Sequence, residues 1–488
     1  MNKGDIVSLK IEDISTEGRG IGKVQGFAVF VRDVVVGDEV SVRVTKVKKN
    51  YAFAEPVEIT VPSPARQEAL CPYYRECGGC IYQETDYSTQ LQIKRRQIRD
   101  KLIRIGGIDQ PAVAPVIGMD EPLRYRNKAS MPVSTGGLIT KKGGIMVPVH
   151  EPRIGFYQAK SHSVIDCRDC MLQSEPAMAA AEALRRFMEE DNITSYDPRW
   201  EKGLMRHMIV KTAFGTGQVM VILVINGKGI PNAAKLVEML DDAIYNVPVY
   251  EEGPFAGIEF NLESVIVNVN TQKGSEIMGK ECITLAGQST IIEKAGDLEF
   301  EISPMSFYQV NPVQMKKLYG KVLEYADLSG NETILDLYCG VGTIGLFCAD
   351  YMRKKGGCGK VIGIESVKEA VVDASRNAVI NGIVNAVYVC GKAEEKLSEL
   401  TEARGADVVI LDPPRAGCDR RLLETVSEAA PEKIIYVSCD PATMARDISY
   451  MSQRGYYLEE ATPVDMFPWT SSCECVAKLV RSDDRDGL

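Results

Sequence analysis

The sequence predicts a multidomain α/β protein of 488 residues with three successive parts. Residues 1–60 consist of short alternating strands separated by glycine turns, a pattern typical of a small closed β-barrel. Residues 61–290 mix strand-like runs with helical stretches and indicate a mixed α/β central domain. In residues 291–488, and most clearly after residue 305, apolar runs alternate with helix-patterned stretches. This alternation predicts a parallel sheet with crossover helices, in a doubly wound domain.

The composition is that of a soluble globular protein, with 45% hydrophobic and 25% charged residues. The longest apolar runs, such as VMVILVI (219–225), are far shorter than the ~18 residues of a membrane span. No signal peptide is visible, so we expect a cytoplasmic protein whose 14 cysteines are thiols or metal ligands. The net charge of −10 argues against nucleic acid as a partner unless the basic residues cluster. We expect no membrane partner, and a monomer.

Lysines and aromatic residues lie side by side in the barrel segment VTKVKKNYAF (44–53). Lysines bind backbone phosphates and aromatic rings stack on bases, so this segment suits RNA. A solvated basic strand without a ligand explains the same pattern equally well. The segment alone leaves both interpretations open.

Three cysteines follow the barrel at Cys71, Cys77 and Cys80, with a Gly-Gly pair that allows a tight wrap around a metal centre. Structural zinc and iron–sulfur clusters usually take four ligands, so a fourth donor is expected. Cys167 and Cys170 both offer one. Spacing alone does not distinguish zinc from an iron–sulfur cluster.

The central part also contains a strongly basic helix, predicted over 87–107 and ending at a Gly-Gly C-cap. We expect this helix to pack on the carboxyl-terminal domain. A second helix is predicted near 174–191, and a hairpin around FGTGQ (214–218). If RNA is bound, the basic residues have to be concentrated, and the candidate places are the barrel, Arg95–Arg96 and Arg124–Lys128.

A glycine-rich turn in LDLYCGVGTIGL (335–346) lies directly after a predicted strand and before a helix. Such glycines let the backbone approach a ligand, and the missing Gly-Lys-Ser/Thr ending argues against a triphosphate. Glu365 ends the next strand, where a carboxylate accepts both ribose hydroxyls of a nucleoside cofactor. Asp412 follows a later strand in LDPPR. This set favours S-adenosylmethionine over a dinucleotide, with ordinary turn glycines as the alternative.

Cys439 leaves the end of the apolar strand in IIYVSCDPATMARD (434–447). Asp440 and Pro441 then begin a helix, whose dipole favours the thiolate form of a nearby thiol. Glu474 is predicted at the start of the last strand, although a surface glutamate is the commoner explanation for such a residue. A thiolate nucleophile, a carboxylate base and a methyl donor form a coherent chemical set.

These segments together resemble the RNA uracil-5-methyltransferase family. FYQVNP (307–312), LDLYCGVGT, LDPPRAG, YVSCDPATMARD and DMFPWTSSCE occur in the family's order and spacing. The amino-terminal barrel and SPARQEALCPYYRECGGCIYQ (63–83) are similar to the TRAM domain and iron–sulfur segment of the branch that acts on 23S ribosomal RNA, and RYRNKA (124–129) is similar to a further family segment. The resemblance covers nearly the whole chain. It implies an OB-like TRAM barrel, a central domain with an iron–sulfur segment, and a Rossmann-like S-adenosylmethionine-dependent methyltransferase domain.

The resemblance also implies residue roles. Cys439 is then the nucleophile that adds to carbon-6 of uracil, and Glu474 is the base that removes the carbon-5 proton. Positions that hold S-adenosylmethionine in the family are matched by Gln309, Tyr338, Glu365 and Asp412. The ligands of a 4Fe–4S cluster are matched by Cys71, Cys77, Cys80 and Cys170, with Cys167 as an extra thiol. Trp469 and Ser472 stand where the family commonly has histidines.

The resemblance therefore predicts methylation of carbon-5 of a specific uridine in 23S ribosomal RNA, either naked or in a pre-ribosomal particle. Transfer-RNA methylation is the alternative within the same chemistry, although that branch typically lacks the barrel and the cysteine cluster. Methylation of carbon-5 of cytosine follows similar covalent chemistry. A non-catalytic RNA-binding iron–sulfur protein is the alternative from a different class. The joint presence of Cys439, Glu474 and the glycine turn argues against it.

Overall fold

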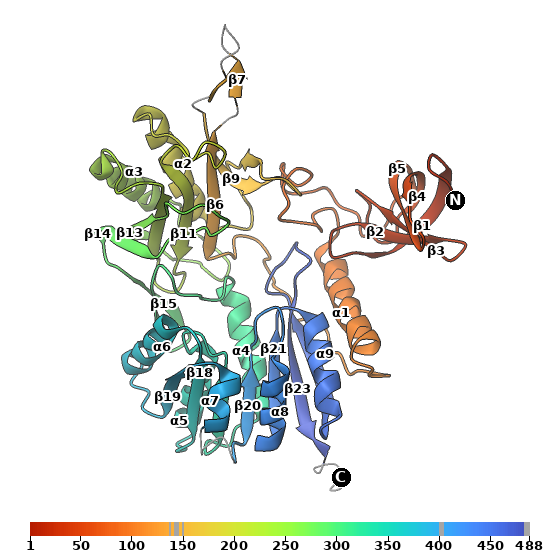
Figure 1. Ribbon diagram of the computed structural model, residues 1–488, viewed down its shortest axis with the longest axis vertical. Coiled ribbons are helices and arrows are strands. Elements are labelled where there is room, and N and C mark those ends of the chain that lie inside the picture. Colours follow the sequence, from red (N-terminus) through yellow and green to blue (C-terminus); the bar gives the residue numbers. More distant parts are fainter. Residues whose placement is uncertain (136–137, 141–145, 149–150, 400–404, 483–488) are drawn as a thin grey trace.

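The computed structural model describes residues 1–135, 138–140, 146–148, 151–399 and 405–482. Figure 1 shows three parts, with the barrel on one flank, the central sheet above and a larger α/β domain below. Helix α1 stands between the barrel and the α/β domain. Among the described helices, none combines the length and the apolar content that crossing a membrane requires.

The amino-terminal strands close into a five-stranded barrel in the order β1-β2-β3-β5-β4, as the sequence predicts. Alternate residues of β1 and β4 are buried, because successive side chains of a strand point to opposite faces. The barrel has its own apolar core, which includes Ile11, Val29, Val40 and Ala54. Its strands are β1 (Ile6–Ile14), β2 (Gly20–Val24), β3 (Phe27–Val31), β4 (Glu39–Val47) and β5 (Tyr51–Val61).

The central part is built on a seven-stranded sheet in the order β10-β9-β6-β11-β12-β13-β14. The predicted helix near 174–191 is found as α2, and the predicted hairpin joins β11 to β12. Helices α2 (Glu175–Glu190) and α3 (Ala233–Tyr245) pack against each other beside this sheet. Its strands are β6 (Lys128–Thr135), β9 (Pro152–Tyr157), β10 (Val164–Asp166), β11 (Met205–Thr212), β12 (Gln218–Ile225), β13 (Asn261–Val269) and β14 (Glu281–Gly287), and a separate pair is formed by β7 (Leu138–Thr140) and β8 (Met146–Pro148).

The predicted basic helix is α1 (Tyr87–Arg104), which ends three residues before the predicted boundary at residue 107. Its first turn is capped by Asp86, whose side chain accepts a hydrogen bond from the Thr89 backbone N–H. It ends earlier because Gly107 takes a positive φ of 68° and turns the chain away. Helix α1 packs against α9 (Pro441–Ser452) and β22 (Tyr456–Val464) of the carboxyl-terminal domain.

The carboxyl-terminal domain has a seven-stranded sheet in the order β19-β18-β17-β20-β21-β23-β22. The first five strands in this order are parallel, whereas β23 is antiparallel to both of its neighbours. Helices cover both faces, which makes the domain doubly wound. Its remaining elements are α4 (Pro312–Ala326), β17 (Thr333–Leu337), α5 (Thr343–Lys354), β18 (Lys360–Glu365), α6 (Lys368–Ile380), β19 (Ala386–Cys390), α7 (Ala393–Glu399), β20 (Val408–Leu411), α8 (Arg420–Ala429), β21 (Lys433–Ser438) and β23 (Glu474–Arg481).

A short ribbon, β15 (Ile291–Ala295) with β16 (Leu298–Ile302), joins the central and carboxyl-terminal domains. Its apolar residues belong to a core that also contains Ile222 of β12 and Ile334 of β17. The central sheet and the carboxyl-terminal domain therefore share one continuous apolar core. The opposite face of the carboxyl-terminal sheet has a second core, to which α1 contributes Leu102.

Candidate functional site

One edge of the carboxyl-terminal sheet carries five of the predicted site residues. Tyr338 follows β17, Glu365 ends β18 and Asp412 follows β20, because parallel strands end at the same edge. Cys439 follows β21. Glu474 begins β23, as predicted, and β23 is antiparallel to β21, so its first residue lies at this edge too. The register pairs the last residue of β21 with the second residue of β23, and this places Cys439 opposite Glu474.

The glycine turn after β17 is bound to the end of β18. The backbone N–H of Gly340 donates to Oε2 of Glu365 at 3.1 Å. Tyr338 itself has a positive φ of 65°, which is uncommon for a bulky side chain and points to a functional constraint. Gly342 is required by close approach, since a Cβ there would lie 2.6 Å from the Tyr388 hydroxyl. At Gly340, by contrast, a Cβ would meet no heavy atom within 4 Å, so the backbone of the turn is open there.

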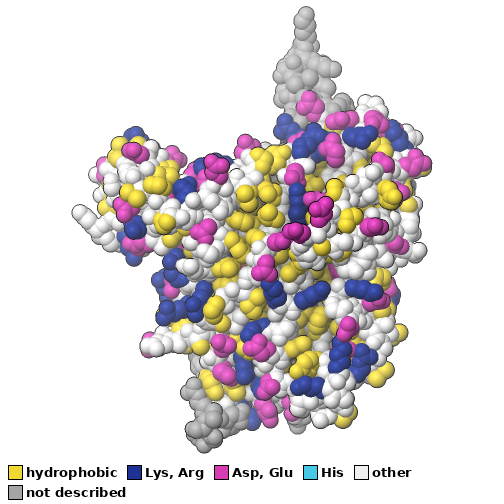
Figure 2. All heavy atoms as spheres, turned by 180° about the vertical axis from the view of Figure 1, so that it is seen from behind, with side chains coloured by type: hydrophobic (Ala, Val, Ile, Leu, Met, Phe, Trp, Pro, Cys, Tyr) yellow, Lys and Arg dark blue, Asp and Glu magenta, His cyan; other side chains and the backbone are white. Residues whose placement is uncertain are grey.

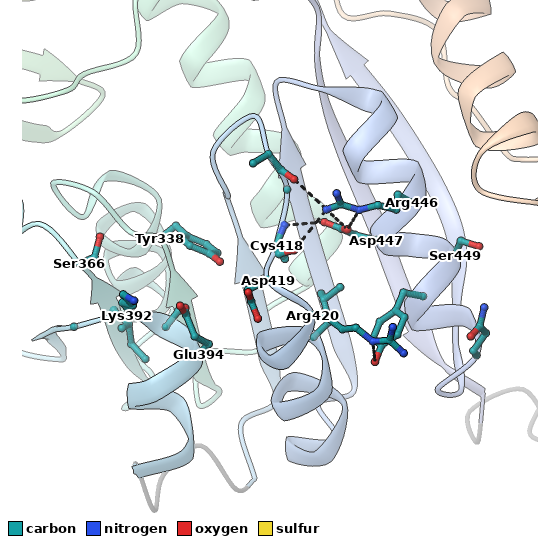
Figure 3. A pocket seen from close by; sticks show the side chains of 18 of the residues that line it. Tyr338, Ser366, Lys392, Glu394, Cys418, Asp419, Arg420, Arg446, Asp447 and Ser449 are labelled. Carbon is teal, nitrogen blue, oxygen red and sulfur yellow. Dashed lines mark hydrogen bonds and ion pairs between the residues drawn. The ribbon is translucent and has the colours of Figure 1, made fainter. Parts of the chain in front are cut away.

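A cavity of about 780 Å³ opens beside this turn, between the strand ends and helices α8 and α9. Figure 3 shows Tyr338, Lys392 and Glu394 on one side of the cavity and Arg420 and Arg446 on the other. Its volume lies in the range of small-molecule sites. Of the four predicted cofactor residues, Tyr338 lines this cavity.

Gln309 lies in the buried loop that precedes α4. Its backbone carbonyl accepts a hydrogen bond of 2.9 Å from the side-chain amide of Asn127, at the start of the central sheet. The loop that carries Gln309 is therefore fixed by the central domain.

Asp336, on β17 beneath the glycine turn, is a residue that our sequence reasoning missed. Burial and the negative charge of Asp412 raise its pKa to about 7. Its Oδ2 accepts from the Gly345 N–H at 2.9 Å, while Oδ1 has no hydrogen-bond partner among the described residues. An acidic residue inside an apolar strand is the sequence signal that could have identified it.

Cys439 lines a second, smaller cavity of about 270 Å³. Its walls come from distant parts of the chain: Thr16 of the barrel, Lys101 of α1, Arg415 after β20 and Ser472 before β23. No pattern in the sequence places the barrel or α1 beside Cys439. A molecule that reaches the thiol therefore passes between these parts.

The charges around the thiol oppose its ionisation. Burial raises the pKa of Cys439, and the negative charges of Glu474 and Asp412 raise it further. Helix α9 does begin directly after Asp440, but our expectation of a favoured thiolate is wrong for the free protein. Burial and the two neighbouring acids raise the pKa of the Cys439 thiol, while Arg415 lowers it.

Glu474 is a buried residue with only 4% of its surface exposed, which excludes the surface glutamate that the sequence alone favours. Burial and the charge of Asp412 raise its pKa to about 8, against the opposing effect of Arg415. Burial likewise raises the pKa of Asp412. Two carboxyl groups that share a buried site do not both ionise readily. Glu474 is therefore suited to accept a proton near neutral pH.

The cysteines of the central part lie near one another. Burial raises the pKa of Cys71, Cys77 and Cys80, and negative charge on Cys170 raises each further. A hydrogen bond with Cys167 lowers the pKa of Cys170 to about 6. Over the described ranges, however, no three His, Cys, Asp or Glu side chains are placed to hold a metal ion. The metal site stays a prediction, and both Cys167 and Cys170 lie beside the other thiols.

Comparisons with known proteins agree with this architecture. Residues 288–482 match the tRNA (uracil-5-)-methyltransferase family, and residues 2–57 match the TRAM domain. An uncharacterized RNA methyltransferase of Clostridium tetani is 40% identical over 99% of this chain and 98% of its own length. Another, from Caldanaerobacter subterraneus subsp. tengcongensis, is 41% identical over 99% of this chain and 100% of its own length.

A solved structure resembles the whole chain as well. It is the tRNA (uracil-54, C5)-methyltransferase of Pyrococcus abyssi in complex with S-adenosyl-L-homocysteine, with 28% identity and a TM-score of 0.72. The similarity covers 97% of this chain and 100% of that one. These matches extend over both the barrel and the domain that carries Cys439 and Glu474. The chain therefore belongs to the RNA uracil-5-methyltransferase family and carries an amino-terminal TRAM domain.

Proposed function

We propose that this protein uses S-adenosylmethionine to methylate carbon-5 of a specific uridine in 23S ribosomal RNA. The observation that carries the proposal is the position of Cys439 opposite Glu474 at a sheet edge that also holds the glycine turn. A nucleophile and a base on opposite strands can act on the same pyrimidine ring.

In the proposed reaction, the sulfur of Cys439 forms a bond to carbon-6 of uracil and the thiol loses its proton. This addition is needed because carbon-5 of uracil is a poor nucleophile until the ring becomes an enolate. S-adenosylmethionine would supply the methyl group that carbon-5 then takes, with its methyl–sulfonium bond broken and S-adenosylhomocysteine as the leaving product. Glu474 removes the proton from carbon-5, and the bond between carbon-6 and sulfur breaks, which releases 5-methyluridine and leaves Cys439 as a thiolate that then regains a proton.

The residues at the glycine turn suit a nucleoside cofactor. Oε1 of Glu365 accepts hydrogen bonds from Ser366 and the Val367 N–H, while Oε2, among the residues that the structure describes, accepts from Gly340 alone. Because a carboxylate has about four acceptor sites, Oε2 retains capacity for a ribose hydroxyl. The nearby cavity lined by Tyr338 has room for the cofactor. We assign its binding to Tyr338, Glu365, Asp412 and Gln309.

The protein is acidic overall, but basic residues gather where RNA would approach Cys439. Figure 2 shows Lys and Arg side chains on the flank below the barrel, where α1 lies. Arg95, Arg96, Arg99 and Arg104 of α1 are exposed. Such clusters neutralise phosphates whatever the net charge. Arg124, which the sequence suggested for the same role, is half-buried and pairs with an aspartate of the central domain at 2.6 Å, whereas Arg96 stays exposed although it pairs with Asp13 at 2.7 Å.

Labelled S-adenosylmethionine should transfer its methyl group to unmodified 23S ribosomal RNA and not to transfer RNA. Mapping of the label should locate it in 5-methyluridine at a discrete position. Transfer RNA is the second candidate substrate, because the similar Pyrococcus abyssi enzyme is a tRNA methyltransferase and its similarity extends over 97% of this chain, so the barrel does not by itself argue against transfer RNA. Label in transfer RNA alone would keep the chemistry and replace the substrate. Label in neither RNA, with S-adenosylmethionine still bound, would refute the proposal for free RNA.

We also propose that Cys71, Cys77, Cys80 and Cys170 hold a 4Fe–4S cluster. Four thiols near one another, beside a Gly-Gly turn, are the ligand type that such clusters use. No step of the reaction requires an electron, so the cluster would fold the segment and shape the RNA-binding surface.

Protein purified without oxygen should contain iron and acid-labile sulfide. Replacing Cys170 with serine should remove the iron, because a cluster loses stability with its fourth thiolate, whereas Cys167→Ser should retain it. Elemental analysis and the visible absorption of the cluster measure both outcomes. Zinc without iron or sulfide would overturn the assignment.

A further inference from the structure

Residues 465–473, which we call the strap, connect β22 to β23 and lead directly into Glu474. Ser471, Ser472 and Cys473 of the strap also line the cavity around Cys439. Glu474 is the first residue of its strand and pairs with the last residue of β22. Pairing within the sheet therefore fixes the backbone that follows Glu474. The backbone that precedes Glu474 is fixed only if the strap has one conformation.

The first attachment of the strap is a buried ion pair with helix α1. The Lys94 ammonium donates to Oδ1 of Asp465 at 2.6 Å and to the Phe467 carbonyl at 3.1 Å. Both charged side chains have no exposed surface. The hydroxyl of Tyr87, also on α1, donates to Oδ2 of Asp465 at 2.9 Å. Burying two charges is costly, and removal of one partner would leave the other charge buried and unpaired, so the pair firmly ties the strap to α1.

The second attachment joins the strap to residues 63–83, the cysteine segment that contains Cys71, Cys77 and Cys80. The backbone N–H groups of Ile81 and Tyr82 donate to the Trp469 carbonyl at 2.9 and 3.2 Å. The Trp469 indole is buried and packs in a cluster that includes Cys80 and Cys170.

Trp469 is fixed further by its own side chain and backbone. Its Nε1 donates to the Pro122 carbonyl at 2.7 Å. Its φ of 69° is unfavourable for a bulky residue and persists only where the surroundings enforce it. Trp469 thus holds the strap in one conformation.

We propose that the strap is a positioning device for Glu474, held by Lys94 and Asp465 at one end and by Trp469 in the middle. The inference rests on the proposed function, because it assigns these positioning residues to the step in which Glu474 takes the carbon-5 proton. A misplacement of a catalytic group by 1 Å can slow a reaction by about 10²-fold. Helix α1 and the cysteine segment therefore act on proton removal through the strap.

The test compares two RNA substrates that differ at carbon-5. With uridine, the methylated adduct breaks down only after Glu474 removes the proton. With 5-fluorouridine, carbon-5 has no proton to remove, so the methylated adduct accumulates without help from the base. The two rates to compare are the release of 5-methyluridine from uridine RNA and the formation of the adduct with 5-fluorouridine RNA. Their ratio separates the positioning of Glu474 from attack by Cys439.

Two variants detach the strap. The double variant Lys94→Met, Asp465→Leu replaces the ion pair with apolar residues of similar size, a change that folded proteins often tolerate. Trp469→Phe keeps a buried ring and removes the hydrogen bond to Pro122. Each should release 5-methyluridine about 10- to 100-fold more slowly and accumulate the adduct with uridine RNA. Both should form the 5-fluorouridine adduct at a rate near that of the unmodified protein, with an unchanged KM for RNA.

Lys235→Met is the matched control, because it makes the same kind of substitution, removes an ion pair between α3 and Asp191 of the central domain, and leaves the strap intact. Its ratio of the two rates should equal that of the unmodified protein. If the strap variants slow 5-methyluridine release and 5-fluorouridine adduct formation by the same factor, the strap shapes the whole cavity. That result would overturn the inference. Normal release in both variants would overturn it as well. If the unmodified protein forms no adduct with either RNA, the proposed function itself has failed.

Discussion

Cys439→Ala should abolish methyl transfer to RNA, with a loss of about 10⁴-fold or more, because covalent addition is what activates carbon-5. The thiol is half-buried in the small cavity between α1, the barrel and the strap, and alanine fits there without steric conflict. The fold and the cofactor site should therefore survive. The measurement is incorporation of labelled methyl groups, with S-adenosylmethionine binding followed in parallel.

Cys358→Ala provides a control for the loss of a thiol, because Cys358 is exposed and lies in the loop between α5 and β18. It should methylate RNA at the normal rate. Substantial turnover by Cys439→Ala would refute the covalent mechanism. Loss of S-adenosylmethionine binding in that variant would instead show that the cysteine supports the cofactor site.

Glu474→Gln should halt the reaction after methylation, with protein and RNA joined covalently. Glutamine has the shape of glutamate but cannot take the carbon-5 proton, so the bond to Cys439 does not break. General bases contribute about 10²–10⁴-fold, and release should slow by that factor. The joined species should appear under denaturing conditions as a band that contains protein, RNA and labelled methyl.

The unmodified protein offers a matching check through pH. Glu474 acts as a base only when it is deprotonated, and its surroundings raise its pKa to about 8. Product release should therefore accelerate as the pH rises toward 8 and level off above it. If Glu474→Gln forms no joined species and transfers no methyl group, the residue acts before methylation and its assignment as the final base is wrong.

Much of the site could be predicted because it depends on local order along the chain. Cys439 and Asp412 each follow an apolar strand, and strands alternating with helices place their carboxyl ends at one edge. The start of the last strand at Glu474 followed from the same pattern. The five-stranded barrel could likewise be predicted from its alternating residues and glycine turns.

The remainder depends on contacts between distant parts of the chain. The last strand inserts between β21 and β22, and only this order places Glu474 opposite Cys439. The buried pair of Lys94 and Asp465 joins residues 371 positions apart, and no periodicity indicates it. The raised pKa of Cys439 has the same origin, because it depends on burial and on the acids at the ends of two other strands. Sequence position alone suggested the opposite ionisation.

The ribbon β15–β16 has a consequence for how the molecule loses its structure. Because one apolar core runs from the central sheet through this ribbon into the carboxyl-terminal sheet, neither domain can expose its side of that core without destabilising the other. The two parts therefore form one cooperative folding unit, even though each has its own sheet. The barrel has its own core and is joined to the rest by the small cluster of Ile14, Tyr82 and Ile93. Its unfolding would remove one wall of the cavity around Cys439.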